Sequence, residues 1–77
     1  MSTLTIINTK EECLVEKEII TGIYKHEAYI KIFIRSDRSD YLYIDIPERK
    51  VNNVFRDILK WYNTPDSVSC IIDIDKY

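Results

Sequence analysis

Two stretches in the middle of the chain alternate between apolar and polar residues. In residues 28–36 the even positions up to Ile34 are apolar, and the odd positions include Lys31 and Arg35. In residues 41–46 the even positions are again apolar. A period of two is typical of a strand with one buried face, and the polar residues 36–40 favour a turn. The pattern therefore predicts an antiparallel hairpin.

The register of this hairpin follows from parity. If both isoleucine faces point at one core, opposed residues must both be even or both be odd. Pairing Ser36 with Asp40 across a three-residue loop meets this condition. The expected pairs are Ile34–Leu42, Ile32–Ile44, Phe33–Tyr43, Arg35–Tyr41 and Lys31–Asp45.

A helix is predicted after Pro47, a residue that is well tolerated in a first helical turn. Apolar residues recur at helical spacing between Glu48 and Tyr62, and Pro65 prevents continuation. The apolar stripe consists of Val51, Val54, Phe55, Ile58, Leu59 and Tyr62. We expect Phe55 and Ile58 to face a sheet.

The ends of the chain have strand composition, with fourteen isoleucines against four leucines overall. Residues 69–75 and 4–7 read as strands. Residues 13–25 also resemble strand, but the alternation breaks around Ile19 and Ile20, where a bulge near Gly22 would repair it. Residues 1–77 are thus expected to form a single α+β domain, an antiparallel sheet of four to five strands with one amphipathic helix packed on one face, in the order β-β-β-β-α-β. The other face of the sheet would stay open.

Charge and composition narrow the function classes. Eleven Lys and Arg against thirteen Asp and Glu give a formal charge of −2, which argues against binding driven by bulk positive charge. One glycine and one histidine exclude most glycine-loop phosphate sites and multi-histidine metal sites, so no cofactor is expected. Segments 1–20 and 64–77 are net negative, whereas 21–63 is net positive, an asymmetry that suits steering to a protein partner.

Localisation and thiol state are inferred together. No apolar run approaches the length of a membrane helix and the N-terminus lacks a signal-peptide core, so we expect a cytoplasmic protein that does not bind membranes. Cys13 and Cys70 are then expected to be reduced thiols. A disulfide between them, which would close a long loop, is the alternative.

Catalysis has little support in the sequence. His26 is the only histidine, and no nucleophile motif surrounds it. Asp45, Asp73 and Asp75 could meet at a sheet edge and bind a hard cation, but alternating carboxylates are more often the wet face of a strand. We expect no catalytic residues, no metal site and no enzyme activity.

The outer face of the hairpin is the first candidate for binding. Aromatic residues alternate there with cations, an arrangement that a sheet can use to stack bases of single-stranded nucleic acid. The same cross-strand pairs would also stabilise any sheet. The element order differs from that of the common RNA-recognition module, and the glycine-containing boxes of that module are absent.

A protein-binding surface is the preferred interpretation. Tyr, Trp, Phe and Arg are enriched at interface hot spots, and the chain has six Tyr, two Phe and Trp61. Trp61 lies beside the helical stripe, where it either closes the core or meets a partner. The expected binding residues, for either kind of partner, are Tyr29, Lys31, Phe33, Arg35, Tyr41, Tyr43 and Trp61.

The expected function is that of a small non-catalytic protein-binding module, with a single-stranded nucleic-acid-binding domain as the alternative. The Ile- and Lys-rich, Gly-poor composition suggests an AT-rich genome. Small size and the lack of catalytic motifs favour, by analogy, a viral or mobile-element protein that acts as an inhibitor of a host protein. A homodimer that forms through a sheet edge is a further alternative.

Overall fold

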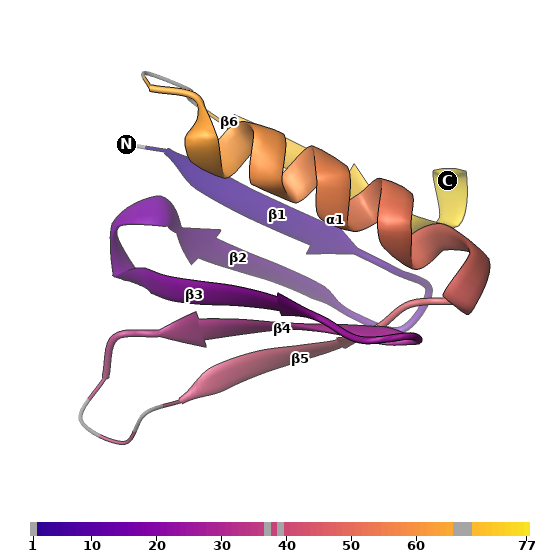
Figure 1. Cartoon of the computed structure of the whole chain (residues 1–77), viewed down its shortest axis with the longest axis horizontal. Helices are drawn as coiled ribbons and strands as arrows, with labels where there is room; N and C mark the ends of the chain where they lie inside the picture. Colours follow the sequence, from indigo (N-terminus) through magenta and orange to yellow (C-terminus); the bar gives the residue numbers. More distant parts are fainter. Residues whose placement is uncertain (1, 37, 39, 66–68) are drawn as a thin grey trace.

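The part of the chain that the structure describes folds into six strands and one α-helix, an α+β fold (Figure 1). The computed structural model describes residues 2–36, 38, 40–65 and 69–77. The elements in chain order are β1 (Thr3–Ile7), β2 (Glu12–Glu16), a 3-10 helix (Lys17–Ile19), β3 (Ile20–Lys25), β4 (Tyr29–Ile34), β5 (Tyr41–Asp45), α1 (Glu48–Asn63), β6 (Ser69–Asp73) and a second 3-10 helix (Ile74–Lys76).

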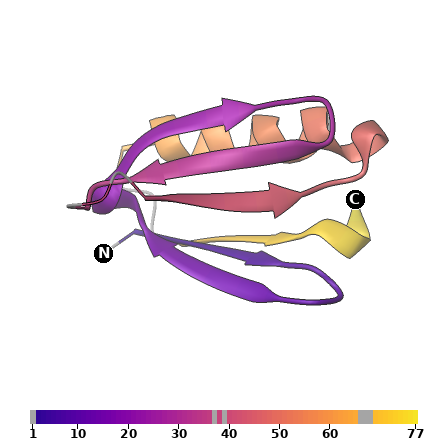
Figure 2. The same cartoon turned by 90° about the horizontal axis from the view of Figure 1, so that it is seen from below.

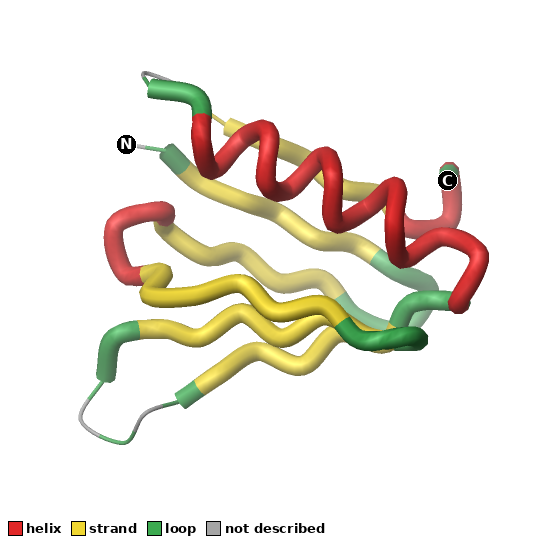
Figure 3. Tube along the Cα trace, viewed as in Figure 1, coloured by secondary structure: helices red, strands yellow, loops and turns green. Residues whose placement is uncertain are grey.

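The strands form two sheets of three, in the orders β2-β1-β6 and β3-β4-β5, instead of the single sheet expected (Figures 2 and 3). The expectation of a purely antiparallel sheet was also wrong at one place, because β1 and β6 pair in parallel. Figure 1 shows the reason. The helix α1 carries the chain back along the molecule, so β6 starts at the same end as β1.

The two sheets separate at the place where the sequence alternation breaks. The 3-10 helix Lys17–Ile19 joins β2 of one sheet to β3 of the other. The register of β3 against β4 then shifts between Ile20 and Gly22, the bulge that the sequence suggested. The segment 13–25 is therefore two strands of two different sheets.

Both sheets and the helix share one hydrophobic core. It is built from residues of every strand, of α1, of the loop after β5 and of the second 3-10 helix, namely Leu4, Ile6, Val15, Ile20, Ile30, Ile32, Ile44, Ile46, Val51, Val54, Ile58, Trp61, Ile72 and Ile74. The helix contacts both β6 and β4. Each sheet therefore turns one face inward and leaves the other to solvent.

The buried stripe of α1 differs from the expected one at its edges. Trp61 is only 5% exposed, so it belongs to the core. Phe55 packs against the core as expected, but it is only partly buried, and the Lys25 ammonium lies 5.5 Å from the centre of its ring. Val51, Val54, Ile58 and Trp61 recur at intervals of three and four, the spacing of a single helical face.

Lys17, in the 3-10 helix between the sheets, binds the C-terminal end of α1. Its Nζ donates to the carbonyl oxygens of Trp61 at 3.2 Å and Thr64 at 3.1 Å. The same ammonium lies 5.4 Å from the ring centre of Trp61 and 5.8 Å from that of Tyr62. A cation is favoured there because the last carbonyls of a helix carry partial negative charge.

The β4–β5 hairpin keeps the expected faces but not the expected register. Ile32 lies opposite Leu42 and Phe33 opposite Tyr41, a shift of two residues. The loop is longer because Ser36 does not join the ladder. Its hydroxyl accepts from the backbone N–H of Arg38 and of Asp40 and donates to the Asp40 carboxylate. Residues 37 and 39 of the expected turn lie outside the described residues.

The shared core predicts that truncating two different isoleucines changes the free energy of unfolding by very different amounts. Ile58 is fully buried on α1, whereas Ile71 of β6 is 70% exposed. Ile58→Ala should lower the free energy of unfolding by about 2–5 kcal/mol, and Ile71→Ala by less than about 1 kcal/mol. Urea unfolding followed by circular dichroism measures both. Equal losses would contradict the position of α1 in the core.

Lys17 should contribute to stability through its ammonium group. Lys17→Met keeps the aliphatic stem but removes the contacts to the helix carbonyls and rings, so we expect a loss of about 1–2 kcal/mol. Lys10→Met, at an exposed lysine, is the control and should change stability by less than about 0.5 kcal/mol. The same unfolding assay tests both variants, and an unchanged Lys17→Met would contradict the capping role.

Candidate interaction surface

The outer face of the β3-β4-β5 sheet carries aromatic rings across all three strands. The isoleucines of β4 and β5 point into the core, so the alternate residues point outward. We call this surface the aromatic face. It consists of Tyr24, His26, Tyr29, Lys31, Phe33, Arg35, Tyr41 and Tyr43.

Four rings of the aromatic face form a continuous series across the sheet. The ring of Tyr24 meets His26 edge-on at 5.0 Å between centroids. His26 stacks on Tyr29 at 4.6 Å, and Tyr29 stacks on Tyr43 at 4.7 Å. These distances lie in the range of favourable ring pairs. The series therefore holds its own side chains in place.

Lys31 joins this series to a second ring pair. Phe33 and Tyr41 lie opposite each other, with centroids 5.6 Å apart. The Lys31 ammonium is 4.8 Å from the ring centre of Tyr41 and 5.7 Å from that of Tyr29. One cation thus bridges both groups of rings, and the aromatic face is a single surface.

The rings remain accessible although they contact one another. Tyr24 and Tyr41 are each 49% exposed, and Tyr43 is 47% exposed. Contiguous apolar area of this kind on a small protein marks a site of interaction more often than a structural need.

The net charge of the aromatic face and its borders is close to zero. Lys31 and Arg35 are its cations, and the carboxylates of Asp45 and Asp40 lie at its borders on β5 and in the hairpin loop. Desolvation, followed by the charge of Asp45, raises the pKa of Tyr43 above its ordinary value. A hydrogen bond with the Asp45 carboxylate contributes to this rise.

The structure brings together six of the seven residues expected to bind, and Trp61 stands apart in the core. It adds Tyr24 and His26, which the sequence analysis missed. The sequence feature that could have placed these two residues is the bulge at Gly22. If the bulge restarts the alternation there, Gly22, Tyr24 and His26 fall on one face of the strand.

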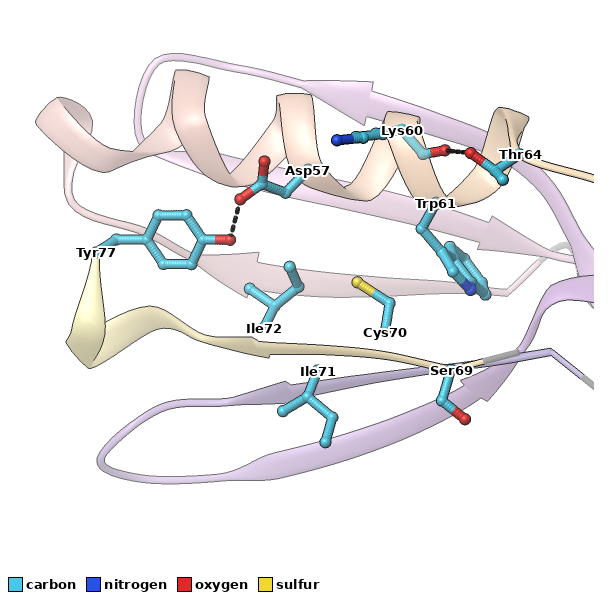
Figure 4. A pocket seen from close by; sticks show the side chains of 9 residues that line it. All are labelled: Asp57, Lys60, Trp61, Thr64, Ser69, Cys70, Ile71, Ile72 and Tyr77. Carbon is cyan, nitrogen blue, oxygen red and sulfur yellow. Dashed lines mark hydrogen bonds between the residues drawn. The ribbon is translucent and has the colours of Figure 1, made fainter. Parts of the chain in front are cut away.

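A second candidate is a groove of about 420 Å³ between α1 and β6 (Figure 4). We call it the α1–β6 groove. Its lining residues are Asp57, Lys60, Trp61, Thr64, Ser69, Cys70, Ile71, Ile72 and Tyr77. At one end the hydroxyl of Tyr77 donates to the Asp57 carboxylate. This bond lowers the pKa of Asp57, and burial with the bond raises the pKa of Tyr77.

The metal and thiol candidates do not form sites. Within the described residues, no group of three or more His, Cys, Asp or Glu is placed to hold a metal ion. Cys13 and Cys70 are free, and β1 lies between them because they pair with Ile6 and Leu4 of that strand. Partial burial raises the pKa of both thiols, so they stay protonated near neutral pH.

Comparison of the chain with protein-family models, curated proteins and solved structures finds no match. In the described part of the chain, no helix has the length and apolar character needed to span a membrane. Function must therefore be argued from the aromatic face and the groove themselves.

The Asp57–Tyr77 bond predicts a pH-dependent effect of Tyr77→Phe. The carboxyl pKa of Asp57 is lower in the folded chain than in the unfolded chain, where it is near 3.8, so the bond adds stability above that pH. This stability is lost as the pH falls through the lowered pKa. The raised pKa of Tyr77 adds stability that is lost above about pH 10. Tyr77→Phe should therefore be less stable than wild type at about pH 5–9, and the difference should shrink at both extremes.

Unfolding midpoints in urea from pH 2.5 to pH 11 measure this difference. Tyr41→Phe on the aromatic face is the matched control, and its difference from wild type should show no loss in acid. A Tyr77→Phe difference that is the same at pH 3 and pH 7 would contradict the pairing.

Proposed function

We propose that this chain is a non-catalytic protein-binding module and that the aromatic face is its working surface. The observation that carries the proposal is the connected set of exposed rings, held in position by ring contacts and by Lys31. Rigid aromatic side chains bind with little loss of conformational entropy and are enriched in interface hot spots. A module of this kind acts by occupying a surface of its partner, so inhibition of a host protein by a phage or mobile-element chain is part of the proposal.

The charge of the aromatic face favours a protein over a nucleic acid. Binding to a phosphate backbone needs several cations that can release counterions. Here Lys31 is placed over two rings, Arg35 is at the edge of the face, and carboxylates lie nearby. Single-stranded nucleic acid is the second candidate, because stacked rings on a sheet can accept bases.

Affinity purification from native-host cells, with and without nuclease, tests the preferred function. Tyr43→Ala removes a central ring of the aromatic face, and Leu14→Ala truncates an even more exposed apolar residue on the other sheet. We expect a nuclease-resistant protein partner with wild type and with Leu14→Ala. Recovery should fall at least about tenfold with Tyr43→Ala, because loss of a hot-spot ring costs about 2 kcal/mol or more.

Both variants must keep the wild-type melting curve for the comparison to hold. A partner that is retained by Tyr43→Ala, or that disappears with nuclease treatment, would contradict the proposal.

The nucleic-acid alternative has a separate test. Labelled poly-pyrimidine and mixed single strands are titrated with protein at low salt, and we expect no binding. Binding tighter than about 1 μM that is lost in Phe33→Ala and weakened by salt would establish the alternative instead.

A further inference from the structure

The strand β6 is the least protected sheet edge in the described part of the chain. Natural edge strands carry charges, bulges or prolines that prevent pairing with other chains. Strand β2 has a glutamate at each end, β3 has a bulge, and β5 is followed closely by Pro47. Strand β6 has a single charge, on Asp73 at its end, and its centre reads Cys70-Ile71-Ile72.

The helix does not close this edge. The helix packs on β6 through the core, but the α1–β6 groove lies open between their outer parts, and β6 is hydrogen-bonded to β1 alone among the described strands. In Figure 4, Cys70 and Ile72 point into the groove, whereas Ile71 points to the opposite face. Ile71 is 70% exposed. An added strand would therefore find open backbone, the partly buried Cys70 on the groove side and the exposed Ile71 on the other side.

We propose that a second copy of this chain pairs with β6, antiparallel and about a twofold axis at Ile71. The sheet β2-β1-β6 would then continue into the copy as a sheet of six strands. The sequence of β6 is self-complementary in this register. Ser69 lies opposite Asp73 of the copy, Cys70 opposite Ile72 of the copy, and Ile71 opposite itself.

Charge complementarity on α1 favours a second copy, to which the Asp57 carboxylate would offer a further contact besides those with Arg56 and Tyr77 of its own chain. Asp57 and Lys60 are one helical turn apart on the side of α1 that lines the groove. Figure 4 places Cys70 and Ile72 beneath this stretch of the helix. A twofold axis sets the two helices antiparallel, so Lys60 of each copy approaches Asp57 of the other. The same groove thus supplies both members of each charge pair.

Sedimentation equilibrium of the full chain tests this interface. Ile71→Lys places two ammonium groups opposite each other at the axis, and like charges directly opposed disfavour pairing. Leu14→Lys is a matched control. Leu14 and Ile71 flank Thr5 on the same face of the sheet and are similarly exposed, at 66% and 70%.

We expect wild type and Leu14→Lys to form the same reversible dimer, and Ile71→Lys to raise the dimer Kd by at least about tenfold. A wild type that stays monomeric at millimolar concentration would overturn the proposal. So would a dimer that is weakened equally by both lysine variants.

A cross-link tests the register independently of stability. In a background with Cys13→Ser and Cys70→Ser, Ile71→Cys should form an intermolecular disulfide on mild oxidation, because residues facing each other at the axis are within disulfide reach. Leu14→Cys in the same background should stay monomeric. Equal cross-linking at both positions would contradict the register.

The dimer does not depend on the proposed function, because the aromatic face lies on the other sheet. Tyr43→Ala should therefore dimerise like wild type. A dimer that is lost with Tyr43→Ala would place the interface on the aromatic face and overturn this inference, whereas a missing protein partner would leave it unaffected.

Discussion

The fold depends on the one hydrophobic core that both sheets share with α1, and Lys17 ties the break between the sheets to the end of this helix. At this point the chain leaves the β2-β1-β6 sheet and enters the β3-β4-β5 sheet. The Lys17 ammonium binds two carbonyl oxygens at the helix terminus and lies near the rings of Trp61 and Tyr62. The buried side chains of α1 hold the helix over both sheets, and Lys17 fixes its C-terminal end beside the break. Each sheet keeps one solvent-facing surface.

These outer surfaces differ in what they can bind. The aromatic face presents rings that are already ordered by one another and by Lys31, which suits a protein partner. The other sheet presents an edge with an uncharged centre and a groove beside it, which suits a second copy of the chain. A dimer through β6 would leave two aromatic faces free and so give a bivalent binder.

Local patterns predicted the elements and the faces, and tertiary contacts decided the rest. Parity in residues 28–46 assigned Phe33 and Tyr43 to the outer face, but the hydroxyl of Ser36 formed a longer loop and moved the register. The parallel pairing of β1 with β6 depends on where α1 returns the chain, which no local pattern encodes. Trp61 was ambiguous because a shift of one residue in helical phase moves it between core and surface.

Site-specific photocross-linking tests the central claim, that the aromatic face is the working surface, most directly. A benzophenone amino acid replaces Tyr43 in one protein and Leu14 in another, and both are irradiated in native-host cells. The account predicts a cross-link to a partner protein from position 43 and none to that protein from position 14. Cross-links from position 43 to nucleic acid, or to the same partner from both positions, would contradict it.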